Sequence, residues 1–175
     1  MHLGYIVFIL DYLVSAFANA FLFYLPIMIA NAFPCLLFYI IGYEIPIDLG
    51  KKFGKEHIFG KRTIGGFLSF LIVGIIVGSM MGKTIEAIYL SSGAFFGVLS
   101  NSFIKRRIGI KEGEDFIPFD QVDYILGATL FYIIGYGINN FDVLILIFGC
   151  ILSFVMHTSG NYLLKKLKKR LKKRL

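Results

Sequence analysis

Long apolar segments alternate with shorter polar segments along the chain. The apolar segments cover residues 12–33, 64–81, 85–104, 124–138 and 143–159. About 30 Å of hydrocarbon requires about 20 residues at a rise of about 1.5 Å each, so we expect these segments to be membrane-spanning helices. The pattern therefore predicts an all-α integral membrane protein with about five transmembrane helices in a single domain over residues 1–175.

Prolines shape the first predicted span. Pro26 lies inside it and Pro34 closes it, and a proline frees a backbone carbonyl and kinks or ends a helix. Residues 35–42 are apolar but too few to cross, so we expect an interfacial or re-entrant piece there. Spans 64–81 and 85–104 are separated only by a tight turn, which predicts a helical hairpin through the membrane.

Composition supports the membrane assignment. Hydrophobic residues make up 57% of the 175 residues, and the mean hydropathy is +0.76, more than a soluble domain of this size could bury. No basic region precedes a short apolar core at the start, so we expect the first apolar segment to be retained. Cys35 and Cys150 lie far apart in apolar runs, and we interpret both as packing residues.

Positive charge predicts the orientation. The polar loops 44–63 and 105–123 and the tail 160–175 hold 17 of the 18 Lys and Arg residues, and Lys83 stands alone on the other side. Cytoplasmic loops are enriched in these residues. We therefore expect both loops and the tail in the cytoplasm and the amino terminus outside the cell membrane. Leucines at helical spacing in the basic tail predict an amphipathic helix on an anionic membrane surface.

The second polar loop carries the strongest chemical signal. Lys105, Arg106 and Arg107 stand where one span ends, and Asp120 and Asp123 stand where the next begins. Two aspartates three apart on a helix share a face and can meet one hard cation. Carboxylates opposite cations suggest magnesium-dependent phosphate chemistry. Residue types alone leave open a positive-inside loop with solvated acids, because such charges also serve topology and the helix dipole.

The remaining titratable residues give weaker signals. Asp11 is the one acid near a span interior, and we expect an interfacial position without a catalytic role. His2, His57 and His157 have no partners at metal-site spacing, and we expect structural roles for them.

Four ordered motifs resemble the CDP-archaeol synthase family, which is itself similar to the CDP-diacylglycerol synthases. They are the strings Pro26–Pro34, Pro46–Lys51, Ser102–Gly109 and Asp120–Ala128. The resemblance implies a membrane cytidylyltransferase that converts CTP and digeranylgeranylglyceryl phosphate to CDP-archaeol and pyrophosphate and requires Mg²⁺. The expected partners are CTP, the lipid and the bilayer, with no nucleic acid. The sequence does not indicate an oligomeric state.

The same motifs predict which residues form the site. We expect Asp120 and Asp123 to hold Mg²⁺ and, with Lys105, to be the catalytic groups. Substrate contacts are expected from Ser102, Arg106, Arg107, Gln121, Lys61, Arg62 and Thr63, and as weaker candidates Asp48 and Asn31.

Two departures from the family pattern bear on this interpretation. The family usually has an aspartate after the glycine that precedes the Ser-Phe motif, yet Val98 follows Gly97 here. The usual Gly-Asp-Gly-Lys-Thr-like string of the family is shortened here to residues 60–63.

Two other classes of protein are rivals to this family. A CDP-alcohol phosphotransferase is disfavoured because its Asp-Gly…Ala-Arg string is absent. A transporter or channel subunit remains the alternative, although the spans place few polar residues near their middles.

Overall fold

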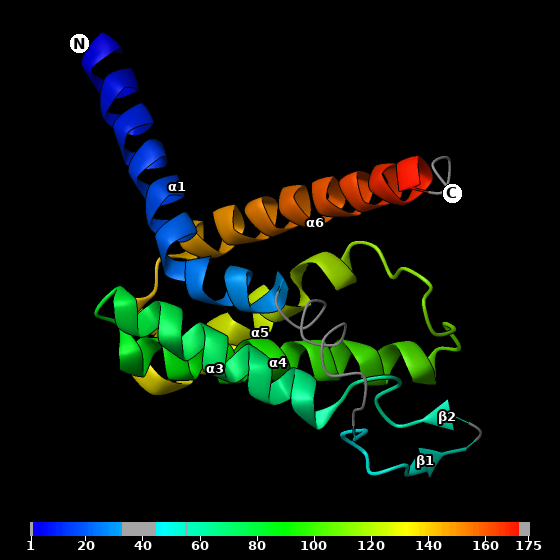
Figure 1. Ribbon diagram of the computed structural model, residues 1–175. Coiled ribbons are helices and arrows are strands. Elements are labelled where there is room, and N and C mark those ends of the chain that lie inside the picture. Colours follow the sequence, from blue (N-terminus) through cyan, green and yellow to red (C-terminus); the bar gives the residue numbers. More distant parts are fainter. Residues whose placement is uncertain (1, 33–44, 55, 172–175) are drawn as a thin grey trace.

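The computed structural model describes residues 2–32, 45–54 and 56–171 and is all-helical apart from one small hairpin (Figure 1). The elements are α1 (His2–Ala32), β1 (Lys52–Phe53), β2 (Glu56–His57), α3 (Ile64–Met80), α4 (Thr84–Arg107), α5 (Phe119–Tyr136), η1 (Ile138–Asn140) and α6 (Val143–Leu171). The all-α prediction is confirmed for the described residues.

Three of the described helices are long and apolar enough to cross a membrane. They contain Gly4–Ala32, Thr84–Arg107 and Val143–Leu163. The helix α3 is apolar but has only 17 residues. The predicted count of five spans and their orientation therefore stay predictions, whereas the presence of several membrane-length apolar helices is established.

The helix that contains the first predicted span begins ten residues before the predicted start of that span. The helix α1 begins at His2, and residues 5–10 continue the same helix with exposed apolar side chains. Asp11 does not interrupt it, because the side chain is exposed on the helix surface. Figure 1 shows the amino-terminal part of α1 projecting away from the other helices. The predicted piece at 35–42, with Cys35, lies outside the described residues.

The predicted helical hairpin is present as α3 and α4, whereas its passage through the membrane stays a prediction. Thr63 caps α3 by accepting a hydrogen bond from the backbone N–H of Gly66 at 3.0 Å. Gly78 of α3 packs against Ala87 of α4 so closely that a Cβ on the glycine would clash. Small residues at such contacts let apolar helices approach closely.

The predicted boundaries of the second polar loop are wrong at both ends. The helix α4 continues to Arg107 and α5 begins at Phe119, so the connection is residues 108–118 instead of 105–123. Three cations in the last turn of α4 and Asp120 in the first turn of α5 match the helix dipole, which favours both extensions. Five of the charged residues assigned to this loop therefore stand on helices, namely Lys105, Arg106, Arg107, Asp120 and Asp123, whereas Lys111, Glu112, Glu114 and Asp115 remain in the connection.

The last predicted span and the described part of the tail, up to Leu171, form one helix. The helix α6 runs without a break from Val143 to Leu171. Asp142 precedes it, accepts a hydrogen bond from the N–H of Leu144 at 2.8 Å, and also accepts one from the hydroxyl of Tyr12 at 3.1 Å. This contact ties α1 to the start of α6. The surface position of the tail stays a prediction.

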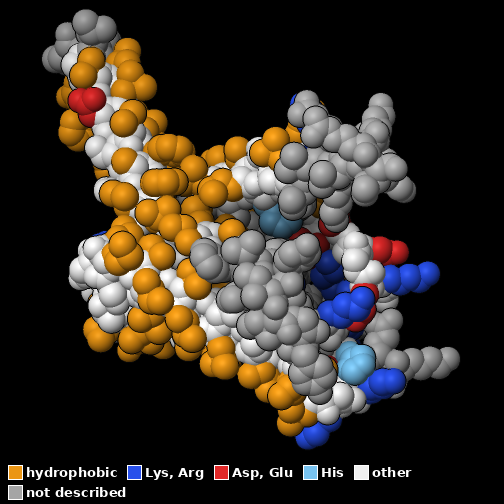
Figure 2. Space-filling view, in the orientation of Figure 1, with side chains coloured by type: hydrophobic (Ala, Val, Ile, Leu, Met, Phe, Trp, Pro, Cys, Tyr) orange, Lys and Arg blue, Asp and Glu red, His pale blue; other side chains and the backbone are white. Residues whose placement is uncertain are grey.

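The core lies where the second half of α1 meets α3, α4 and α5, and α6 packs against it with partly buried side chains. Tyr24 of α1 is fully buried, and its hydroxyl lies 2.6 Å from that of Thr129 in α5. Gly149 of α6 gives the tyrosine ring its space. Figure 2 shows orange apolar side chains over this helical body and charged side chains gathered at one end. That end carries both polar loops (Figure 1).

Candidate active site

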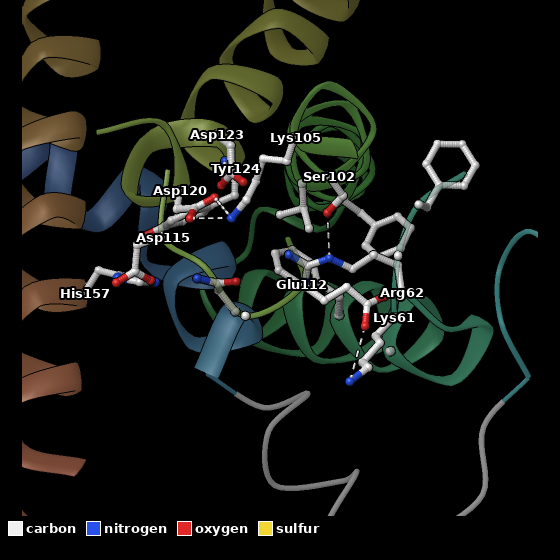
Figure 3. A pocket seen from close by; sticks show the side chains of 18 of the residues that line it. Lys61, Arg62, Ser102, Lys105, Glu112, Asp115, Asp120, Asp123, Tyr124 and His157 are labelled. Carbon is white, nitrogen blue, oxygen red and sulfur yellow. Dashed lines mark hydrogen bonds and ion pairs between the residues drawn. The ribbon is translucent and has the colours of Figure 1, made fainter. Parts of the chain in front are cut away.

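A pocket of about 870 Å³ opens at the charged end of the helix bundle. Its walls come from the ends of α1, α3, α4 and α5, from the middle of α6 and from both polar loops, and Figure 3 shows its labelled side chains pointing into one space. Six apolar side chains also line it, namely Met28, Phe70, Phe95, Val98, Tyr124 and Met156. Met28, Phe70 and Phe95 stand farther from the charged helix ends than the polar lining residues of the same helices, so the inner part of the pocket is apolar.

Close contact between α4 and α5 places the charged groups. A Cβ on Gly97 would clash with the backbone carbonyl of Asp123, and one on Gly93 would clash with the carbonyl of Gly127. Only glycine allows the two backbones to approach this closely. The first half of α5 consequently lies against the second half of α4.

Asn101, Lys105, Asp120 and Asp123 meet there, and we refer to these four residues as the α4–α5 cluster. The amide nitrogen of Asn101 donates to Asp120 Oδ1 at 2.7 Å and to Asp123 Oδ2 at 2.9 Å. The expectation that the two aspartates share a helical face is therefore confirmed. Sequence reasoning missed Asn101, although its spacing of four from both Gly97 and Lys105 puts it on the same face of α4.

Asp120 is held by several donors. Lys105 Nζ donates to its two carboxylate oxygens at 2.7 and 3.0 Å, and the N–H of Phe116 donates at 2.7 Å. Burial acts to raise the pKa of Asp120, but the hydrogen bonds from Lys105, Phe116 and Asn101 outweigh it and leave the pKa below its ordinary value. Asp120 is therefore ionised at neutral pH.

Asp123 lies in the same helix turn but in a different environment. Burial is the main cause that raises its pKa to about 6, and hydrogen bonds from Asn101 and the N–H of Tyr124 only partly oppose this effect. Both aspartates precede the apolar part of α5. The pair thus combines a firmly ionised carboxylate with one that gains or loses its proton near neutral pH.

The first loop adds cations to the opposite wall. Arg62 donates through Nε to the hydroxyl of Ser102 at 2.9 Å, and this contact is drawn in Figure 3. Lys61 forms an exposed ion pair with Glu112 of the second loop at 3.3 Å. Thr63 lines the pocket beside them while capping α3. These residues bring the shortened 60–63 string to the pocket.

The structure brings most of the predicted site residues together. The pocket is lined by Asn31, Lys61, Arg62, Thr63, Ser102, Lys105, Arg106, Asp120 and Asp123. His157, for which a structural role was expected, also lines it. Gln121, Arg107 and Asp48 do not line it.

Arg107 contacts the small hairpin instead of the pocket. Its Nη1 donates to the carbonyl of Phe53 at 2.9 Å, and its guanidinium lies 4.4 Å from the Phe53 ring centroid and 5.1 Å from that of Phe103. Such stacking on aromatic rings is typical of arginine. Arg107 therefore fastens the first loop to the end of α4.

Asp48 organises the first loop from within. Its buried carboxylate accepts hydrogen bonds from the N–H groups of Gly50 and Ile58, both at 3.0 Å, and lies 3.4 Å from His57 Nδ1. Burial acts to raise the pKa of Asp48, but hydrogen bonds from backbone N–H groups and His57 keep it below its ordinary value. Gln121 is also buried, and its backbone carbonyl accepts a hydrogen bond from Ser153.

The charge balance of the pocket fits a bound divalent cation. Four cationic side chains, Lys61, Arg62, Lys105 and Arg106, face five carboxylates, Glu112, Glu114, Asp115, Asp120 and Asp123. A triphosphate would be repelled by this lining unless a cation joined the carboxylates. Among the described residues no three His, Cys, Asp or Glu side chains converge as a ready metal site, and Val98 contributes no oxygen. Asp120 and Asp123 are the carboxylates that converge, and they suit Mg²⁺, which binds through one or two carboxylates and waters.

A polar pocket at the end of an apolar helical bundle defines the general class as an intramembrane protein with a site for charged ligands. The CarS-like family model, described as CDP-archaeol synthase, matches residues 9–172. The chain belongs to this family.

Relatives and a solved structure agree with the family match. The CDP-archaeol synthase of Methanocaldococcus jannaschii is 34% identical over 82% of this chain and 89% of the relative. That of Sulfolobus acidocaldarius is 32% identical over 84% of this chain and 91% of the relative. A solved structure of an intramembrane enzyme for archaeal membrane lipid biosynthesis has a TM-score of 0.72 at 28% identity, covering 83% of this chain and 94% of that one. These comparisons give the transporter alternative no support.

Proposed function

We propose that this protein transfers the cytidylyl group of CTP to the phosphate of a membrane-embedded isoprenoid glyceryl phosphate, which yields CDP-archaeol and pyrophosphate. The observation that carries the proposal is the α4–α5 cluster, in which two carboxylates converge opposite cations in a pocket with an apolar inner wall. Membership in the CDP-archaeol synthase family supports it.

The reaction needs positioning and charge neutralisation more than a strong base. An oxygen of the lipid phosphate attacks the α-phosphorus of CTP, a new phosphoanhydride bond forms, and the bond to the β-phosphate oxygen breaks. A phosphate monoester has its second pKa near about 6, so the nucleophile is already anionic at neutral pH. The absence of a nucleophile–base pair in the pocket is compatible with this chemistry.

The cationic side chains suit the triphosphate. Lys105 is held between Asp120 and the carbonyl of Glu114, with Nζ 2.7 Å from the carbonyl oxygen, and so carries its charge at a fixed point. Arg62 of the first loop is held by a hydrogen bond to Ser102 of α4. We assign Lys105 to the reacting phosphates, and Arg62, Arg106 and the exposed Lys61 to the triphosphate.

Asp120 and Asp123 would hold Mg²⁺ in this proposal. Bound Mg²⁺ would neutralise the charge that moves onto pyrophosphate as it leaves. The backbone contact of Gly97 with the first turn of α5 fixes these two carboxylates relative to Lys105. The protein therefore supplies a rigid frame for the metal and the phosphates.

The apolar side of the pocket suits the lipid. Met28, Phe70 and Phe95 line its inner part and would contact the first carbons of the isoprenoid chains. The phosphate head group would then meet CTP at the membrane interface. The positive-inside rule places that interface on the cytoplasmic face of the cell membrane.

The test is a transfer assay on detergent-purified protein. Radiolabelled CTP, Mg²⁺ and digeranylgeranylglyceryl phosphate are incubated with the enzyme, and label is measured in the organic phase. The expected result is label in a CDP-lipid that depends on the protein, the lipid phosphate and Mg²⁺. Folded protein that binds CTP but transfers no label would refute the proposal.

A further inference from the structure

Asn101 occupies the point where the two carboxylates of the cluster converge. One amide nitrogen contacts an oxygen of each aspartate, at 2.7 Å for Asp120 and 2.9 Å for Asp123. The residue is buried, with 6% of its surface exposed. A buried neutral amide thus holds together two acids that would otherwise repel each other.

The amide carries an acceptor as well as a donor. A half-turn about its Cβ–Cγ bond exchanges the NH₂ group and the carbonyl oxygen, so the same side chain can present an oxygen to the same place. Hard cations accept side-chain amide oxygens as ligands together with carboxylates. Without a bound cation, Asn101 can therefore donate hydrogen bonds to the two carboxylates. With a cation bound, it can coordinate the ion through its amide oxygen.

The neighbouring position on α4 supplies no competing oxygen. Val98, three residues before Asn101 and on the same side of the helix, lines the pocket with an apolar side chain. Lys105, four residues after it, is a cation and cannot ligate a metal. Of the α4 residues in the cluster, Asn101 is the one that can add an oxygen.

We propose that Asn101 supplies the third protein oxygen of the Mg²⁺ site, beside Asp120 and Asp123, by turning its amide when the cation binds. This inference rests on the proposed function and adds a ligand to it. It assigns the metal site of this chain to two carboxylates and one neutral amide.

The experiment uses Mn²⁺ as a paramagnetic substitute for Mg²⁺, added alone to the purified full-length protein. Electron paramagnetic resonance gives the Mn²⁺ affinity, and line broadening in ¹⁷O-labelled water counts the waters on the bound ion. In Asn101→Ala, one more water than in the wild type and an affinity about 10- to 100-fold lower are expected. In Asn101→Asp, which keeps an oxygen at this position, the wild-type water count and an affinity at least as high are expected.

Thermal unfolding without metal shows which variants are folded. An unchanged water count in folded Asn101→Ala, or no Mn²⁺ binding by the wild type, would overturn the inference. If Asn101→Ala does not fold, a higher water count in Asn101→Asp than in the wild type overturns it instead. The label-transfer assay separates the two proposals. If the wild type transfers label but the water count in Asn101→Ala is unchanged, only the ligand role of Asn101 is rejected. If the water counts are as expected but the wild type transfers no label, only the proposed reaction is rejected.

Discussion

The α4–α5 cluster and the first polar loop contain the same kinds of charged residue but use them differently. In the cluster, Asp120 and Asp123 stand on a helix and face the pocket, and Lys105 bridges to Asp120 with only 12% of its side chain exposed. In the first loop, Asp48 faces the loop interior and binds backbone N–H groups. Lys61 of the same loop is 86% exposed.

The difference shows that position in the fold decides what a charge does. The cluster is fixed by helix backbones in direct contact at Gly97 and by hydrogen bonds to Glu114 and Phe116 of the second loop. In the first loop Asp48 stabilises the turns of the loop itself, and Arg107 attaches the loop to α4 through Phe53. Two residues predicted as substrate contacts thus build the wall that carries Lys61 and Arg62.

The largest expected effect is the loss of transfer activity when the charge of Asp123, in contrast to that of a carboxylate far from the pocket, is removed. Asp123→Asn keeps the shape but removes the charge, and transfer activity should fall by about 10³-fold or more, because a catalytic metal supplies several kcal/mol. Glu86→Gln, at the opposite end of α4, is the matched control and should retain wild-type activity. Both are measured by label transfer from CTP, with thermal unfolding as the check of folding. Wild-type turnover in Asp123→Asn would reject the metal assignment.

A second comparison concerns two cations two residues apart on α4. Lys105→Met removes the charge beside Asp120 and should lower kcat by roughly 10- to 100-fold, the size expected for one charge-assisted hydrogen bond. Arg107→Lys weakens the contact with Phe53 and should lower the unfolding temperature while leaving kcat within about twofold. Steady-state kinetics on both variants measure the contrast. An equal loss of kcat in the two would show that both cations act on the substrate.

The pH dependence of stability gives a third test. The pKa of Asp123 is about 6, above its ordinary value of 3.8, so the folded protein holds this proton more tightly than the unfolded chain. The resulting stability is complete below about pH 4 and is lost as the pH rises through 6. The loss is at most about 3 kcal/mol, since each pKa unit corresponds to about 1.4 kcal/mol.

Thermal unfolding of metal-free protein between pH 4 and 7 measures this loss. The unfolding temperature should fall more steeply with pH in the wild type than in Asp123→Asn. The pKa of Asp120 is lowered, so its contribution is lost only at a more acidic pH and does not interfere. Parallel pH profiles in the two proteins would contradict the assignment to Asp123.

The smallest expected effect belongs to Asp48. Asp48→Asn leaves buried N–H groups of the first loop with a weaker acceptor and should cost about 1–3 kcal/mol of stability. The rate at saturating CTP should stay near that of the wild type, because Asp48 lies outside the pocket. Thermal unfolding and kcat are measured on the same preparation. A large loss of kcat without loss of stability would place Asp48 in the site after all.

Much of the architecture could be predicted from hydrophobic pattern alone. The spans at 64–81 and 143–159 correspond to α3 and to the apolar part of α6, because long apolar runs in this composition have few alternatives to helix. The ends were harder to predict. Charges at 105–107 and 119–123 look like loop residues by hydropathy, yet they extend α4 and α5, because the helix dipole and the partners across the cluster favour the helical conformation.

The site was only partly predictable for a similar reason. The spacing of Asp120 and Asp123 predicted a shared face, and the structure confirms it. Asn101 carries no charge and belongs to no familiar metal motif, so its role depends on a contact between helices that the sequence does not reveal. Asp48 and Arg107 were predicted as substrate contacts from residue type and resemblance, although their partners lie in the local folding of the first loop.

In the proposed function, the α4–α5 cluster makes this pocket a site for a metal–nucleotide complex. Calorimetric titration of CTP into the purified protein, with Mg²⁺ and with a chelator, measures whether the metal strengthens nucleotide binding. Because carboxylates outnumber cations in the lining, CTP should bind at least about tenfold more tightly with Mg²⁺. Equal CTP affinity with and without Mg²⁺ would contradict the account.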